Sequence, residues 1–245
     1  MSSEPVLSLQ SVHKMFGGIT AIQEFSLDIM PGEIVALVGD NGAGKSTLVK
    51  IISGVQPMTT GRMVIEGKAV SFRDPAESQH HGIQVVYQDL ALADSQTVYM
   101  NLFLGRELTR GPLRRLDRRR MIAETEALMK DLDVRIPSAG TVIRDLSGGQ
   151  RQGIAIARAT RWASNLVLMD EPTAALGVAE TMRVESIIAG LRARRRSILL
   201  VSHNLDQVFR LADRICVLRH GEQIGIRRTD EVTRNEIVSM ITGLA

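Results

Sequence analysis

The apolar residues of this chain recur with two different periods. In the first 75 residues, apolar and polar positions alternate over 6–12 and 25–29, which predicts half-buried strands, and a further strand is expected at 62–67. From about residue 95 to 163 the spacing becomes that of amphipathic helices. The final third alternates helical stretches with short apolar runs, at 166–169, 198–201 and 215–218. This last pattern indicates βαβ units and a parallel sheet.

One helix in the middle of the chain can be bounded from its sequence. Asp117 is suited to an N-cap position, and Met121 and Leu132 follow it at helical spacing. Chain breakers precede this helix at 110–112 and follow it at 136–140. We therefore expect an α/β core that is divided by a helical insertion.

The composition is that of an ordinary globular protein. Of the 245 residues, 44% are hydrophobic and 23% are charged, and no apolar run approaches the roughly 18 residues of a membrane span. Residues 1–5 show no basic stretch followed by an apolar run, so no secretory signal is expected. The single cysteine, Cys216, lies in a strand-like run at 214–218 and is expected to be a small core residue.

The charges are nearly balanced overall but unevenly placed. The net charge is +3, and arginines gather at 114–115, 118–120, 194–196 and 227–228. Aromatic residues make up only 3% of the chain, so there is no stacking platform for single-stranded nucleic acid. We expect these arginines to lie on solvated helix faces or to contact a partner's acidic surface.

Residues 39–46 follow the pattern G-x-x-x-x-G-K-[ST], which is typical of a loop that cradles phosphates. An apolar strand is predicted just before it, at 34–38, and a helix just after it, at 46–52. Backbone N–H groups and the helix N-terminus would hold the phosphates, Lys45 would reach the β and γ oxygens, and Ser46 would bind Mg²⁺. The predicted nucleotide contacts of this segment are Gly39, Asp40, Asn41, Gly42, Ala43, Gly44, Lys45, Ser46 and Thr47.

An acidic pair, Asp170 and Glu171, ends the apolar strand at 166–169. Alone, such a pair is more often a solvated strand end. With a phosphate loop in the same chain, Asp170 is predicted to bind Mg²⁺ directly or through water. Glu171 faces another way, because successive strand residues alternate, and is predicted to orient or deprotonate the attacking water.

A second anion site is expected at Ser147, which suits an N-cap position before exposed glycine N–H groups. The run Leu146–Gln152 resembles the LSGGQ motif of ATP-binding cassette (ABC) ATPases, and the resemblance covers essentially the whole chain. It implies an α/β fold class: a P-loop NTPase core with a mainly parallel sheet, an N-terminal antiparallel β subdomain and a helical insertion subdomain. It also implies a single ABC ATPase domain, with the core and β subdomain at 1–88 and 164–245 and the helical subdomain at 89–163.

Three further residues acquire roles from this resemblance. Gln88 resembles the glutamine that contacts Mg²⁺ or the attacking water, in a loop that meets the membrane partner. His203 resembles the histidine that hydrogen-bonds the γ-phosphate, and Phe16 the aromatic residue that stacks on adenine. Taken singly, Gln88 and His203 would be ordinary strand-end residues, and Phe16 a core aromatic residue.

The resemblance also implies that two copies pair head to tail around two ATP molecules and their Mg²⁺. The γ-phosphate bound by Lys45 of one copy would then meet the other copy's motif, through Ser147, Gly148, Gly149 and Gln150. The implied catalytic set is Glu171, His203, Gln88 and Lys45, and the implied metal set is Ser46, Gln88 and Asp170.

One position departs from the family pattern. The loop after Glu171 usually carries an aspartate where this chain has Gly177. Gly177 cannot supply a carboxylate to the dimer interface, so communication between the two ATP sites is in question. The expected role of Glu171 is unaffected.

Several runs resemble the carbohydrate importers of the ribose/xylose/fructose-like group, at 39–42, 86–92, 101–107 and 171–178. This implies a homodimeric ATPase that drives solute uptake through a separate integral permease, on the cytoplasmic face of the inner membrane. A periplasmic solute-binding protein would act indirectly, and no nucleic acid is expected. Three alternatives stay open: a cassette for an amino acid or lipid, a soluble ABC ATPase acting on nucleic acid or ribosomes, and a regulatory module with little turnover.

Overall fold

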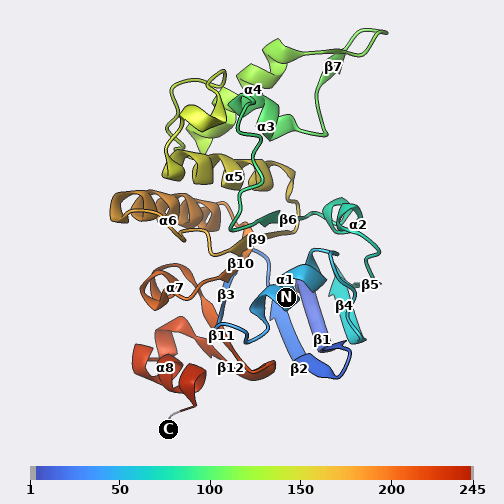
Figure 1. Cartoon of the computed structure of the whole chain (residues 1–245), viewed down its shortest axis with the longest axis vertical. Coiled ribbons are helices and arrows are strands. Elements are labelled where there is room, and N and C mark those ends of the chain that lie inside the picture. Colours follow the sequence, from blue (N-terminus) through green and yellow to red (C-terminus); the bar gives the residue numbers. More distant parts are fainter. Residues whose placement is uncertain (1–3, 244–245) are drawn as a thin grey trace.

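The computed structural model describes residues 4–243, which form one ten-stranded sheet with helices on both faces (Figure 1). The first three residues, which belong to the segment searched for a secretory signal, lie outside the described residues. The strands are β1 (Leu7–Phe16), β2 (Ile19–Ile29), β3 (Ile34–Val38), β4 (Thr60–Ile65), β5 (Lys68–Val70), β6 (Ile83–Val86), β7 (Thr109–Arg110), β8 (Arg115–Leu116), β9 (Leu166–Asp170), β10 (Ser197–Val201), β11 (Arg214–Arg219) and β12 (Glu222–Arg228). The helices are α1 (Lys45–Ile52), α2 (Pro75–His80), α3 (Val98–Phe103), α4 (Arg118–Asp131), α5 (Gly148–Trp162), α6 (Val178–Ala193), α7 (Leu205–Leu211) and α8 (Arg234–Thr242), with 3₁₀ turns η1 (Ile143–Asp145) and η2 (Thr229–Glu231).

The sheet has the strand order β5-β4-β1-β2-β12-β11-β3-β10-β9-β6. β11, β3, β10, β9 and β6 run parallel to one another, whereas β1 pairs antiparallel with β2 and β4, and β4 with β5. The parallel strands are short and mostly apolar because helices cover both of their faces. The expected fold class, an α/β core with an antiparallel N-terminal part and helical insertion, is confirmed.

Two apolar clusters lie on opposite faces of the parallel strands. In β3, Ile34, Ala36 and Val38 point into one cluster, and Val35 and Leu37 into the other. The helices α3 to α7 pack in the first cluster, and α1 packs in the second. Cys216 of β11 is fully buried in the second cluster, as expected for a core residue, and burial raises the pKa of its thiol to about 12.

The two N-terminal strands are longer than the sequence pattern predicts. β1 continues to Phe16 and β2 begins at Ile19, and their register shifts three times along the pair. Ser11, at the first shift, has a left-handed φ of 46°. Each irregularity interrupts the strict apolar–polar alternation from which strand lengths were predicted.

The middle segment is mainly helical but contains a two-stranded hairpin. The chain breakers at 110–112 form its turn between β7 and β8, where helical spacing was expected to dominate. α4 begins as predicted, because the Asp117 side chain accepts a hydrogen bond from the Arg120 backbone N–H. The subdomain boundaries at 89 and 163 stay a prediction, since the inserted helices share one apolar cluster with the sheet.

Candidate active site at the carboxyl edge of the sheet

Four neighbouring parallel strands end together at one edge of the sheet. In register, Leu37 of β3 pairs with Val201 of β10, Val201 pairs with Asp170 of β9, and Val86 of β6 pairs with Met169. The phosphate loop, His203, the acidic pair and Gln88 follow these four strands within two residues. The structure therefore brings to one edge most of the residues predicted to handle a nucleotide. Such an edge is where open α/β sheets bind ligands.

The phosphate loop has a backbone that requires glycine. A Cβ on Gly39, which has a φ of 154°, would lie 2.0 Å from the Leu218 carbonyl oxygen. A Cβ on Gly44, with a φ of 107°, would lie 2.6 Å from the Ile22 side chain. Gly44 is also the N-cap of α1 and offers no side-chain cap, so the first N–H groups of this helix face the loop unpaired by a cap. A cleft of about 450 Å³ opens here, lined by Asn41, Gly42, Gly44, Lys45, Ser46 and Thr47.

Lys45 is held inside this loop. Its ammonium group donates hydrogen bonds to the Gly39 carbonyl at 2.7 Å and to the Asp40 carbonyl at 2.9 Å. Burial lowers the pKa of Lys45, although Glu171 and Asp170 oppose this effect. The arrangement holds a cation beneath the cleft, where it can meet an anionic ligand.

The two acids differ in their surroundings. Burial, reinforced by the Glu171 carboxylate, raises the pKa of Asp170. Glu171 has a left-handed φ of 51°, and its Oε2 lies 2.8 Å from His203 Nδ1. The unusual backbone turns the Glu171 side chain toward His203 rather than along the strand. A carboxylate beside an imidazole is an arrangement that can accept or relay a proton.

A buried polar network fixes the loops that carry Glu171 and His203. Gln207 of α7 is fully buried; its Oε1 accepts from Ser202 Oγ and its Nε2 donates to Thr173 Oγ1, both at 2.9 Å. The Asn204 side chain accepts from the Gln207 N–H and so caps α7. Gln207 was not predicted as a site residue, although its position three residues after an asparagine is an N-cap signal.

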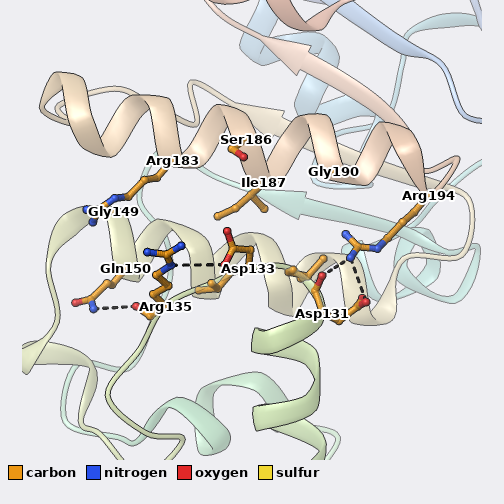
Figure 2. A pocket seen from close by; sticks show the side chains of 12 residues that line it. Asp131, Asp133, Arg135, Gly149, Gln150, Arg183, Ser186, Ile187, Gly190 and Arg194 are labelled. Atoms are coloured by element: carbon orange, nitrogen blue, oxygen red, sulfur yellow. Dashed lines mark hydrogen bonds and ion pairs between the residues drawn. The ribbon is translucent and has the colours of Figure 1, made fainter.

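The second predicted anion site lies elsewhere in the chain. Ser147 caps α5 in a reciprocal capping box with Gln150. Gly149 and Gln150 line a separate cleft of about 390 Å³ between α5 and α6 (Figure 2). The cleft around the phosphate loop is lined by no residue from this motif. One chain therefore places its two predicted phosphate-binding elements in different clefts.

Glu180, in the first turn of α6, already occupies the start of α5. Its Oε1 accepts a hydrogen bond from the Gly149 N–H at 3.1 Å, and its side-chain carbons lie 3.0–3.4 Å from where a Gly149 Cβ would be. That hydrogen bond is the largest cause that lowers the pKa of Glu180, followed by one from the Ser147 side chain. Glu180 was not predicted as a site residue, and no local pattern indicates its reach to Gly149.

Phe16 and Gly177 complete the set of predicted positions. Phe16 is 43% exposed and does not line the phosphate-loop cleft, although its register partner Ile19 does. Gly177 is the N-cap of α6, without a side chain to cap it, and faces open space. An aspartate there would have offered the α6 N-terminus a cap.

The donor set fits Mg²⁺. Ser46, Gln88 and Asp170 offer only oxygen ligands, which a hard cation prefers. Within residues 4–243 no group of three or more His, Cys, Asp or Glu side chains is placed to hold a metal ion. This composition suits a cation that takes its other ligands from phosphates and water. None of the helices within residues 4–243 has both the length and the apolar character of a membrane span.

Comparison with known proteins identifies relatives over the full length. The family model "ABC transporter" matches residues 22–174. The chain is 42% identical to a xylose/arabinose import ATP-binding protein of Sulfolobus acidocaldarius, covering 98% of this chain and 95% of that protein. It is 41% identical to a fructose import ATP-binding protein of Rhizobium meliloti, covering 99% and 96%. A ribose import ATP-binding protein of Yersinia pestis is 38% identical, with 99% of this chain matching 47% of that protein.

Solved structures of ATP-binding cassettes are similar to this chain over nearly its whole length. An ATP-binding cassette of an ABC transporter in its ADP conformation has a TM-score of 0.81 at 25% identity, covering 99% of this chain and 96% of that one. A dimeric cassette in a post-hydrolysis state with ADP and Pi has a TM-score of 0.75 at 26% identity, covering 91% and 98%.

The raised pKa of Asp170 predicts that its ionised carboxylate lowers the free energy of unfolding of the protein. The folded chain holds the Asp170 proton more tightly than the unfolded chain, in which the carboxyl group has its ordinary pKa of 3.8. Ionised Asp170 therefore destabilises the fold increasingly as the pH rises above 3.8. The destabilisation reaches its full size above the pKa that Asp170 has in the folded chain. Asp170→Asn should raise the free energy of unfolding at neutral pH, and this gain should vanish below pH 3.8.

Urea denaturation of parent and variant at neutral and acidic pH measures the difference. Asp230→Asn is the matched control, because Arg228 lowers the pKa of Asp230 and the variant should give no gain at neutral pH. An Asp170→Asn protein less stable than the parent at neutral pH would contradict the prediction.

Proposed function

Since this chain belongs to the ABC transporter family of ATPases, we propose that it is the ATP-hydrolysing subunit of a sugar importer. The observation that carries the proposal is the match, at 41–42% identity over nearly their whole length, to two sugar import ATP-binding proteins. A cassette for an amino acid or lipid is not favoured by these relatives. A soluble ATPase acting on nucleic acid is not favoured either, because aromatic residues make up only 3% of the chain.

We propose that the working unit is a homodimer with two shared ATP sites. The support from this chain is the separation of the phosphate-loop cleft from the α5 start, which leaves each element half of a site. A related cassette, 26% identical, is dimeric with ADP and Pi bound. In the proposed dimer, Ser147 and Gly149 of one copy meet the γ-phosphate held by Lys45 of the other.

The chemistry assigned to this site is positioning and charge stabilisation. Lys45 and the loop N–H groups hold the β- and γ-phosphates, and Mg²⁺ held by Ser46, Gln88 and Asp170 would neutralise phosphate charge when bound. Glu171 accepts a proton from the attacking water, and His203 holds the Glu171 carboxylate in place through Nδ1. His203 also lies at the strand edge where the γ-phosphate would sit. Dimer closure excludes bulk water, so hydrolysis depends on the partner copy.

A membrane permease has a candidate docking surface on this chain. A groove of about 220 Å³ runs between α2, β6 and α5, directly before the Gln88 loop. Tyr87, Leu104 and Trp162 line it, and the Arg106 guanidinium lies 4.9 Å above the Trp162 ring. Exposed apolar and aromatic groups in a concave surface are typical of a protein-binding site. We propose that a cytoplasmic segment of the permease binds here and that the chain works peripherally on the cytoplasmic face of the inner membrane.

Isolation of the protein from membranes of its source organism tests the transport assignment. A tagged copy should co-purify with an integral permease whose partner is a periplasmic sugar-binding protein. Ribose, xylose and fructose should then be tried as stimulators of ATPase activity in the reconstituted complex. Recovery of the protein on ribosomes or DNA would overturn the proposal.

The role of Glu171 predicts a separation of binding from turnover. Glu171→Gln should keep ATP affinity, accumulate an ATP-bound dimer and lose roughly 10²–10³-fold in turnover, as for removal of a single transition-state contact. Phosphate release, nucleotide binding and size-exclusion chromatography measure the three effects. Glu126→Gln, which removes the same charge from an exposed position on α4, is the matched control. Parent-level ATPase activity in the Glu171 variant would rule out the water-activating role.

The contact between Glu180 and Gly149 predicts that the Glu180 carboxylate competes with the partner's γ-phosphate for the Gly149 N–H. Its carboxylate accepts from the Gly149 N–H, which the proposed dimer needs for the partner's ATP. Glu180→Gln, placed in the Glu171→Gln background, should form the ATP-bound dimer at roughly 3- to 10-fold lower ATP concentration, because a negative charge leaves the helix start. Glu222→Gln on β12 is the control. A dimer that needs more ATP than the control would show instead that Glu180 supports closure.

A further inference from the structure

The positive charge of the chain is concentrated in one projecting segment, residues 104–120, which we call the basic hairpin. It contains seven arginines and two acids, whereas the whole chain has a net charge of only +3. The remainder of the chain therefore has a net negative charge. The segment includes β7, β8 and the first turn of α4, and it extends outward at the top of the molecule, beyond α3 and α4 (Figure 1).

Five of these seven arginines have no side-chain partner within residues 4–243. Within the described part of the chain, no ion pair or side-chain hydrogen bond engages the exposed residues Arg110, Arg114, Arg115, Arg118 and Arg119. Many arginines elsewhere do have partners, as when Arg214 forks onto Glu33 and Arg210 onto Glu185. Arg106 and Arg120, at the two ends of the basic hairpin, do contact the fold, through the Trp162 ring and Glu124. The other five arginines contribute no ion pair or side-chain hydrogen bond to the part of the fold that the structure describes.

The basic hairpin is also locally unfavourable in three respects. Arg118 and Arg119 occupy the first turn of α4, where the helix dipole favours acids, and no acidic residue lies in that turn. Arg114 has a left-handed φ of 48°, and Leu113, at the tip of the turn, is 74% exposed. Several locally unfavourable features in one segment, without a contact that offsets them, are typical of a functional surface.

We propose that the basic hairpin binds the anionic phospholipid surface of the membrane that holds the permease. Arginine side chains pair with phosphate headgroups through bidentate hydrogen bonds, and Leu113 enters the interfacial region between them. An apolar tip flanked by cations suits a fluid anionic surface better than an acidic protein surface, which would leave Leu113 without a matching pocket. This inference goes beyond the ATPase assignment but rests on the proposed importer function, which supplies the membrane; vesicle binding can fail while the ATPase activity and the permease partner are confirmed, so the two proposals can be told apart.

The position of the basic hairpin agrees with this partner. Leu104 and Arg106, at its beginning, line the groove proposed for the permease. A permease docked there would bring the bilayer surface near the same end of the molecule. The hairpin would then hold the ATPase against the membrane independently of the nucleotide state.

Sedimentation of the full-length protein with lipid vesicles tests the proposal. The probes are vesicles of phosphatidylcholine alone and vesicles of phosphatidylcholine and phosphatidylglycerol in equal parts. The parent should sediment with the anionic vesicles only, and added salt should release it. Arg110→Gln/Arg114→Gln/Arg115→Gln should lower the partition coefficient by roughly fivefold for each arginine removed. Leu113→Ser should give a smaller loss that salt does not change.

A second triple variant controls for net charge. Arg62→Gln/Arg195→Gln/Arg227→Gln removes the same charge from exposed positions outside the hairpin and should bind vesicles like the parent. Basal ATPase activity should be unchanged in all variants, which shows that they are folded. Parent protein that ignores anionic vesicles, or equal losses in the two triple variants, would overturn the proposal and leave an acidic protein surface as the explanation for the arginines.

Discussion

The parallel register of β3, β10, β9 and β6 is the constraint on which the rest of the structure depends. Val201 pairs with Leu37 on one side and Asp170 on the other, and the Glu171 N–H donates to the Val201 carbonyl at 2.9 Å. A slip of one residue in β9 would turn Asp170 to the other face of the sheet and move the turn that carries Glu171. The distances among the phosphate loop, the acids and His203 are therefore set by strand pairing, which two apolar clusters hold in place.

This edge of the sheet is where the chain departs from its most stable arrangement. Lys45 and Asp170 are partly stripped of water, and burial shifts the pKa of each toward its neutral form. Glu171 has a left-handed backbone, and Gly39 and Gly44 have conformations closed to other residues. Such departures persist because the surrounding core overdetermines the position of the loops. Their concentration around one cleft agrees with a site built to stabilise phosphate charge.

The sequence predicted those features that depend on local pattern. The strand, loop and helix between residues 34 and 52, the strand ending in Asp170, and the caps at Asp117 and Ser147 were all placed correctly, because each is written in consecutive residues. Contacts between distant segments were not predictable in this way. The reach of Glu180 to Gly149 spans 31 residues, and the bond from Gln207 to Thr173 spans 34. The bulges of β1 were missed because they interrupt the periodicity used to find strands. The chain break at 110–112 was predicted, but the strands β7 and β8 on either side of it were missed because each has only two residues and shows no periodicity.

The helix α5 links the two ends of the proposed mechanism. Its N-terminus carries Gly149 in the first turn and Ser147 as the N-cap, and its last turn carries Trp162 in the groove proposed for the permease. At 1.5 Å per residue, a helix of 15 residues spans about 22 Å. The Arg158 guanidinium donates to the Leu90 and Ala91 carbonyls at 2.8 Å, which ties α5 to the loop after Gln88. Because a helix resists compression and its side chains are packed in the core, a shift imposed at the α5 start by a partner's γ-phosphate would be carried along the helix to the groove. Under the proposed function, α5 is the direct physical route by which nucleotide binding between two copies would affect the permease.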